Sequence, residues 1–157
     1  MTEKRVLVAY YSYSGNTKVM AEKIRSKIGG DIFEIMPVKK YPNNYNDVVN
    51  IAQKEKSEGY KPELLNNIDI SNYDIIFIGT PVWWYTFSSP IRTFLADNDF
   101  QDKTIIPFCT HGGGGASATY TDMQELAPEA LVKEGFAAYE NSATDIDIQA
   151  WLNRVIN

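Results

Sequence analysis

The chain alternates between short continuous apolar runs and segments in which apolar residues recur every three or four positions. A continuous apolar run is typical of a strand buried on both faces of a parallel sheet, whereas recurrence every three or four positions predicts an amphipathic helix. The runs predict strands at residues 5–11, 32–36, 75–79, 104–110 and 130–138.

The segment after the first run shows the helical pattern clearly. Met20, Ile24 and Ile28 are spaced four residues apart, and the glycine pair at 29–30 ends the helix that they predict. Serine, threonine and proline residues indicate where later helices begin. One helix is predicted at 47–57. Three more are predicted to begin at a serine cap at Ser89, at a capping box formed by Thr121 and Gln124, and at a cap near Thr144.

Strands and helices that alternate along a chain predict the α/β class, with a parallel sheet covered by helices on both faces. A length of 157 residues fits one domain, so we expect a single domain over residues 1–157. In open sheets of this kind, ligands bind beyond the carboxyl ends of the strands, where the strand order reverses. We therefore expect the functional residues in the loops after the first, third and fourth strands.

Composition and charge disfavour several classes of function. The 20 acidic and 15 basic side chains give a net charge of -5, which argues against binding to nucleic acid or to an anionic membrane. Cys109 is the only cysteine, so neither an internal disulfide nor a cysteine-based metal site can form, and no metal site is predicted. The apolar run at 6–11 is too short for a signal peptide or a membrane span. We expect a cytoplasmic protein.

The loop after the first strand, SYSGNT at 12–17, has the chemistry of an anion site built without basic side chains. Ser12, Ser14 and Thr17 offer hydroxyl groups. Asn16 offers an amide, and Gly15 allows main-chain N–H groups at a helix N-terminus to approach a ligand. The spacing matches neither a Walker A motif nor a dinucleotide fingerprint. A phosphate site and a simple hydroxyl-rich capping turn are the two interpretations.

The other two loops add an aromatic surface and a main-chain edge. Trp83, Trp84 and Tyr85 directly follow a buried strand, so at least one must face the loop edge, where it would suit a planar ligand. The alternative is that all three complete the core or a dimer contact. The glycines at 112–115 allow main-chain N–H groups to approach a ligand, or simply form a mobile loop. We interpret His111, the only histidine, first as a structural hydrogen-bond partner.

A phosphate site, a planar platform and a main-chain donor edge are together the three parts that FMN requires. With these motifs the chain resembles the flavodoxin-like family of FMN-binding proteins. SYSGNT is similar to the family's phosphate loop, GTPVWW to its loop beside the isoalloxazine ring, and FCTHGGGG to its loop at the pyrimidine edge.

The resemblance covers nearly the whole chain. It implies a three-layer sandwich with a five-stranded parallel sheet of order 2-1-3-4-5 and FMN at its carboxyl edge. The implied cofactor-binding residues are Ser12, Tyr13, Ser14, Gly15, Asn16, Thr17, Pro81, Val82, Trp83, Trp84, Tyr85, Thr110, His111, Gly112, Gly113 and Gly114. No catalytic residue is predicted.

Two functions remain open at this stage. The first is electron transfer between FMN and a redox partner protein. The second is an FMN-dependent NAD(P)H:quinone or flavin oxidoreductase, in which a nicotinamide or quinone substrate meets an open face of the ring. That face is open if Tyr120, the first aromatic residue after the glycine run, does not fold back over it.

A regulatory domain without flavin is disfavoured. A receiver domain needs acidic residues at these strand ends, and this chain has Ser12, Ser14 and Pro81 there instead. Both a monomer and a homodimer are compatible with the sequence.

Overall fold

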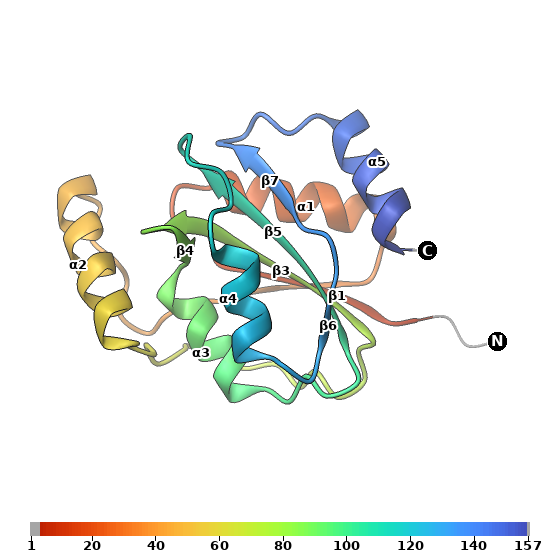
Figure 1. The fold of residues 1–157 in the computed structure, drawn as a ribbon, viewed down its shortest axis with the longest axis horizontal. Coiled ribbons are helices and arrows are strands. Elements are labelled where there is room, and N and C mark those ends of the chain that lie inside the picture. Colours follow the sequence, from red (N-terminus) through yellow and green to blue (C-terminus); the bar gives the residue numbers. More distant parts are fainter. Residues whose placement is uncertain (1–3, 157) are drawn as a thin grey trace.

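The computed structural model describes residues 4–156. Helices cover both faces of a largely parallel sheet, so the chain forms three layers (Figure 1). In chain order the elements are β1 (Val6–Tyr10), α1 (Asn16–Ile28), β2 (Asp31–Glu34), α2 (Tyr45–Glu58), β3 (Ile75–Trp83), β4 (Thr86–Phe87), α3 (Ser89–Asp97), β5 (Thr104–His111), α4 (Thr119–Leu126), β6 (Leu131–Val132), β7 (Phe136–Tyr139) and α5 (Asp145–Ile156).

The sheet confirms the α/β class predicted from the sequence, and its strand order is consistent with the one that the resemblance implies. Its path is β2-β1-β3-β5-β6, with β7 also paired to β5 and β4 paired to β3. All pairs are parallel except the β3–β4 hairpin. The sheet has more strands than predicted, because β3 continues past residue 79 and turns back as β4, and because the last predicted strand is divided in two.

The single strand predicted at 130–138 is wrong in its middle. The carbonyl of Glu134 accepts the indole N–H of Trp151 at 2.9 Å instead of a bond from a neighbouring strand. The ring of Tyr120 occupies the space beside Gly135, where a Cβ would lie 2.4 Å from a ring carbon. These contacts separate β6 from β7, and both come from residues distant in the sequence.

Helix starts were predicted with mixed success. The cap near Thr144 is confirmed, because its hydroxyl oxygen accepts the main-chain N–H of Asp147 at 3.1 Å. Ser88, rather than Ser89, is the residue that precedes α3. The capping box at Thr121 is wrong, because α4 begins two residues before it.

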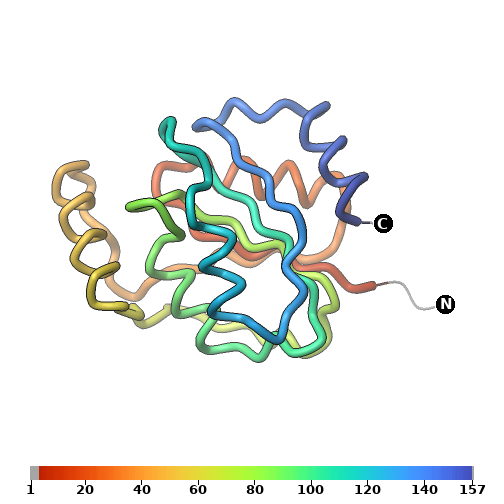
Figure 2. The backbone as a smooth tube through the Cα atoms, viewed as in Figure 1, coloured from red at the N-terminus to blue at the C-terminus, as the bar shows by residue number. Residues whose placement is uncertain are grey.

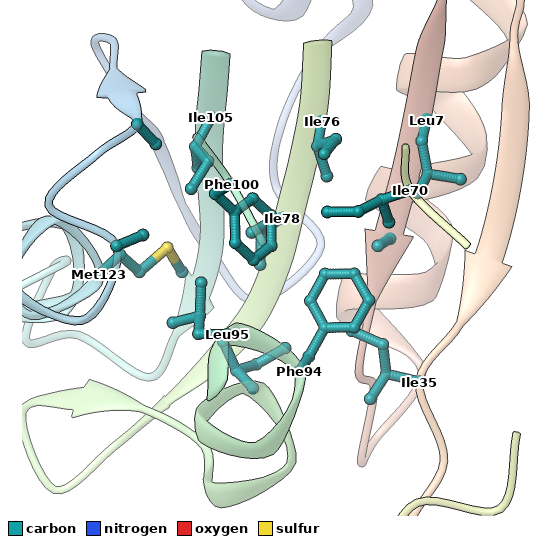
Figure 3. Close-up of a cluster of buried hydrophobic side chains, with 14 of the residues drawn as sticks. Leu7, Ile35, Ile70, Ile76, Ile78, Phe94, Leu95, Phe100, Ile105 and Met123 are labelled. Atoms are coloured by element: carbon teal, nitrogen blue, oxygen red, sulfur yellow. The ribbon is translucent and has the colours of Figure 1, made fainter. Parts of the chain in front are cut away.

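Residues that alternate along the strands pack on opposite faces of the sheet. Leu7 and Ala9 of β1 join the cluster beneath α3 and α4, whereas Val8 and Tyr10 join the cluster beneath α1 and α5. Figure 3 shows the first cluster, where the rings of the labelled phenylalanines meet isoleucines of β3 and β5. Within residues 4–156, no helix is long and apolar enough to cross a membrane.

Helix α2 lies at one side of the molecule, beside the edge where β3 and β5 end (Figures 1 and 2). It begins at Tyr45, two residues before the predicted start, because Asn44 caps it by accepting the N–H of Asp47 at 3.2 Å. Only Val48 and Ala52 of this helix are buried. Its position gives the sheet edge an additional wall.

Candidate cofactor-binding site

A cleft of about 580 Å³ lies at the carboxyl ends of β1, β3 and β5. The three loops singled out in the sequence meet there, as expected for parallel strands that end at one edge of a sheet. The lining residues are Tyr13, Ser14, Asn16, Tyr45, Val48, Val49, Ala52, Pro81, Val82, Trp83, Trp84, Tyr85, Thr110, His111, Gly112, Gly114, Gly115, Ser117 and Glu140.

Most of the predicted site residues line this cleft, but four of them do not. Ser12, Gly15, Thr17 and Gly113 lie outside the lining. Their side chains or main-chain groups instead shape the loops that form it.

Ser12 organises the loop at 12–17 from within. Its hydroxyl oxygen accepts the main-chain N–H groups of Gly15 and Lys18, both at 3.1 Å. Gly15 adopts a left-handed conformation (φ 100°), which a side chain would strain. The loop therefore places Ser14 and Asn16 on the cleft side.

The start of α1 provides main-chain donors. Within residues 4–156, the N–H groups of Asn16 and Thr17 form no hydrogen bond, as is usual for the first turn of a helix. These N–H groups and the helix dipole favour an anion at this end of the cleft. No lysine or arginine is among the lining residues drawn from 4–156, so an anion here would be bound by neutral hydrogen-bond donors.

A buried hydrogen bond joins the first loop to the third. The hydroxyl groups of Thr17 and Thr110 lie 2.7 Å apart. Their side chains are almost inaccessible, since Thr17 is 1% and Thr110 is 5% exposed. The bond fixes the start of α1 against the end of β5.

The aromatic residues of the second loop divide between core and cleft. The Trp83 ring packs edge-on against three tyrosine rings, at centroid distances of 5.6 Å to Tyr11, 5.9 Å to Tyr13 and 5.0 Å to Tyr41. Tyr85 is 65% exposed. The expectation that at least one of the three faces the loop edge is confirmed.

Trp84 and Tyr85 form the two-residue turn between β3 and β4. Both have positive φ, 53° for Trp84 and 71° for Tyr85. Two-residue hairpins need such angles, which asparagine and glycine adopt at low cost but bulky aromatic residues do not. The strain, about 1–2 kcal/mol per residue, must be offset by contacts around the turn.

Three residues outside the turn hold it in place. The indole N–H of Trp84 donates to the carbonyl of Val49 in α2 at 2.7 Å. The ammonium of Lys56 donates to the carbonyl of Trp84 and lies 5.7 Å from the centre of the Tyr85 ring. The N–H of Ala118 donates to the carbonyl of Tyr85 at 2.9 Å. We call the two hydrogen bonds that join Trp84 to Val49 and to Lys56 the α2 clamp.

Sequence reasoning missed the contribution of α2. The helix adds Tyr45, Val48, Val49 and Ala52 to the cleft. The spacing of Val48 and Ala52 on one helix face is the only signal that could have indicated it.

The glycine loop is shaped by His111. The Nδ1 atom of its ring accepts the N–H groups of Gly113 at 3.0 Å and Gly115 at 3.2 Å. The ring thus holds the main chain of the loop at two points. His111 therefore has the structural role that the sequence favoured.

Tyr120 does not fold back over the cleft. Its ring packs against Gly135, and its hydroxyl lies 3.4 Å from the Cys109 sulfur. Burial raises the pKa of the Cys109 thiol to about 11, so at neutral pH this cysteine is protonated and unreactive. Tyr120 is not among the residues that line the cleft.

Comparisons with known proteins agree with this fold. A family model for flavodoxin matches residues 5–155. A chain from Bacteroides eggerthii DSM 20697, assigned as a flavoprotein, is similar with a TM-score of 0.88 and 30% identity, over 99% of each chain. A flavoprotein from Lactobacillus acidophilus NCFM, solved in complex with FMN, is similar with a TM-score of 0.75 and 30% identity, over 95% of this chain and 99% of that one.

Proposed function

The chain belongs to the flavodoxin family, and we propose that it is an electron carrier that binds FMN in the cleft at the carboxyl edge of its sheet. The observation that carries this proposal is the arrangement of the cleft. The cleft brings together N–H donors at the start of α1, two indoles and the glycine loop.

The residues present fit the phosphate group of FMN. Ser14, Asn16 and the main-chain N–H of Thr17 would hold it, through neutral donors at the positive end of α1. Ser12 and Thr17 would act indirectly, because their hydroxyl groups are already bonded within the protein.

The residues also fit the flat ring of FMN. Trp83, Trp84 and Tyr85 would flank it, and the loop at 110–114 would face its polar edge. A Cβ at Gly112 or Gly114 would meet nothing within 4 Å, so there is open space beside both of these cleft-lining glycines. When bound, FMN would supply the redox chemistry, and the protein would supply its position and its electrostatic surroundings.

The charges of the cleft favour a carrier over a nicotinamide-dependent enzyme. A nicotinamide dinucleotide carries a pyrophosphate, which proteins usually neutralise with basic side chains or a second helix N-terminus. Among residues 4–156, the only charged side chain in the lining is the carboxylate of Glu140. A redox partner protein needs no such site, because it would exchange electrons with the bound cofactor from outside the cleft.

An FMN-dependent NAD(P)H:quinone or flavin oxidoreductase is the second candidate. The position of Tyr120 favours it, because this ring packs against Gly135 and leaves the cleft uncovered on that side. A flat substrate could then reach the cofactor directly.

An anaerobic reduction experiment separates the two candidates. FMN-loaded protein is mixed with NADPH or NADH, and the visible flavin bands are recorded, with dithionite as the positive control. A carrier keeps its spectrum with either nucleotide and loses it with dithionite. Rapid bleaching by a nucleotide alone would overturn the carrier and support the oxidoreductase.

The phosphate assignment has its own test in the affinities for FMN and riboflavin. Ser14→Ala should raise the dissociation constant for FMN roughly tenfold to a hundredfold, the effect of losing one hydrogen bond to a charged group, and leave that for riboflavin unchanged. Ser26→Ala, which removes a hydroxyl bonded to Lys23 within α1, is the matched control. Equal losses for both ligands would contradict the assignment.

A further inference from the structure

A second cleft, of about 350 Å³, lies on the other side of α2. We call it the lysine cleft. It is lined by Lys39, Lys40, Tyr41, Pro42, Ile51, Lys54, Glu55, Glu58, Tyr60 and Pro62. None of these residues lines the cleft assigned to FMN, so α2 separates two distinct sites.

The charged side chains of the lysine cleft leave it with unpaired positive charge. Lys39, Lys40 and Lys54 form no ion pair or side-chain hydrogen bond with any part of the chain between residues 4 and 156. The lining also holds two carboxylates, Glu55, which accepts the hydroxyl of Tyr41 at 2.6 Å, and Glu58, so the lysines exceed the carboxylates by one charge. Three free ammonium groups gathered in one cleft are unusual in a protein with a net charge of -5.

The remaining lining residues are apolar and aromatic. Ile51 is 37% exposed and Tyr60 is 49% exposed, and proline rings at 42 and 62 lie beside them. Exposed apolar side chains in a concave site with a few polar groups at its rim are typical of a small-molecule site. An inorganic anion would use the lysines and leave this apolar surface in contact with water.

We propose that the lysine cleft binds a small organic anion with a flat, apolar body, such as an aromatic carboxylate. The body lies against Ile51, Tyr60 and the two prolines, and the acidic group meets the ammonium groups. Tyr41 forms the wall toward the other site, since its ring lies 5.0 Å from that of Trp83. The ligand therefore binds next to the FMN cleft without entering it.

Titration with 2-naphthoate, followed by NMR of the ¹⁵N-labelled protein, tests the proposal. Saturable shifts of the amides at 39–41 and 51–61, unchanged when FMN is present, are expected. Neutral 2-naphthamide should bind at least fivefold more weakly, and inorganic phosphate should not saturate at the same amides. If FMN displaces naphthoate, or phosphate binds equally well, the proposal is overturned.

Charge variants provide the second test. Lys39→Gln/Lys54→Gln should weaken naphthoate binding at least fivefold and leave FMN binding unchanged. The control Lys4→Gln/Lys18→Gln makes the same change of charge at exposed residues that line neither cleft. Equal loss in both variants would mean that net charge, rather than the lysine cleft, attracts the anion, and would refute the proposal.

Discussion

The buried bond between Thr17 and Thr110 allows the role of one hydroxyl to be measured. Thr17→Val keeps the shape of the side chain and removes its hydroxyl, which leaves the hydroxyl of Thr110 buried without its partner. An unsatisfied buried group costs about 1–3 kcal/mol. Because the two residues are only 1% and 5% exposed, water cannot replace the bond easily. We expect a loss of about 2 kcal/mol in the free energy of unfolding.

The double variant makes this prediction specific. In Thr17→Val/Thr110→Val neither hydroxyl remains, so no polar group is left unsatisfied, and the stability should return close to that of the unmodified protein. Urea unfolding of the FMN-free protein, its two single variants and the double variant gives the coupling energy; with a loss of about 2 kcal/mol in each single variant and almost none in the double variant, its magnitude should be about 4 kcal/mol. The FMN-free protein is used so that ligand binding does not contribute.

The result that would refute this reasoning concerns both stability and ligand choice. If Thr17→Val leaves the free energy of unfolding unchanged and selectively weakens FMN relative to riboflavin, the hydroxyl belongs to the phosphate site and not to Thr110. The preference for FMN over riboflavin that Ser14→Ala loses, measured in the same ligand titrations, is the reference for a residue of the phosphate site.

Three further predictions test other parts of the structure. Gly79→Ala would place a Cβ 2.2 Å from the Phe108 ring and should lower the free energy of unfolding by about 3 kcal/mol, whereas Gly112→Ala, with open space around it, should be neutral in the same urea titration. Lys56→Met removes one bond of the α2 clamp and should raise the dissociation constant for FMN roughly two- to fivefold in a fluorescence titration; an unchanged constant would mean that the turn holds its shape without this bond. Burial raises the pKa of Cys109 from 9.0 to about 11, so the unfolded chain loses this proton first and stability should fall as pH rises through that window; the fall, about 1–2 kcal/mol, should be smaller in Cys109→Ala.

The central elements of the fold could be predicted because their signals are local. β1, β3 and β5 are continuous apolar runs, and α1 and α5 have regular apolar faces with glycine or threonine at their ends. These patterns also located the three loops of the cleft, since parallel strands end at one edge.

The features that escaped prediction depend on contacts between distant residues. The break between β6 and β7 reflects the ring of Tyr120 beside Gly135 and the bond from Trp151. The left-handed turn at Trp84 and Tyr85 contradicts their intrinsic preference and exists only because α2 and the start of α4 hold it. The place of α2 could not be inferred from a helix with two buried residues.

The α2 clamp also determines how the cleft can open over time. Because Trp84 is bonded to Val49 and Lys56 of α2, the turn at Trp84 and Tyr85 can move away from the cleft only together with this helix. With only two buried side chains, α2 is the kind of element that opens locally at a low free energy and exchanges its amide protons early. Escape of the cofactor and deuterium uptake in α2 should then follow one opening event. The residence time of the cofactor would be governed by how firmly this helix is attached to the sheet.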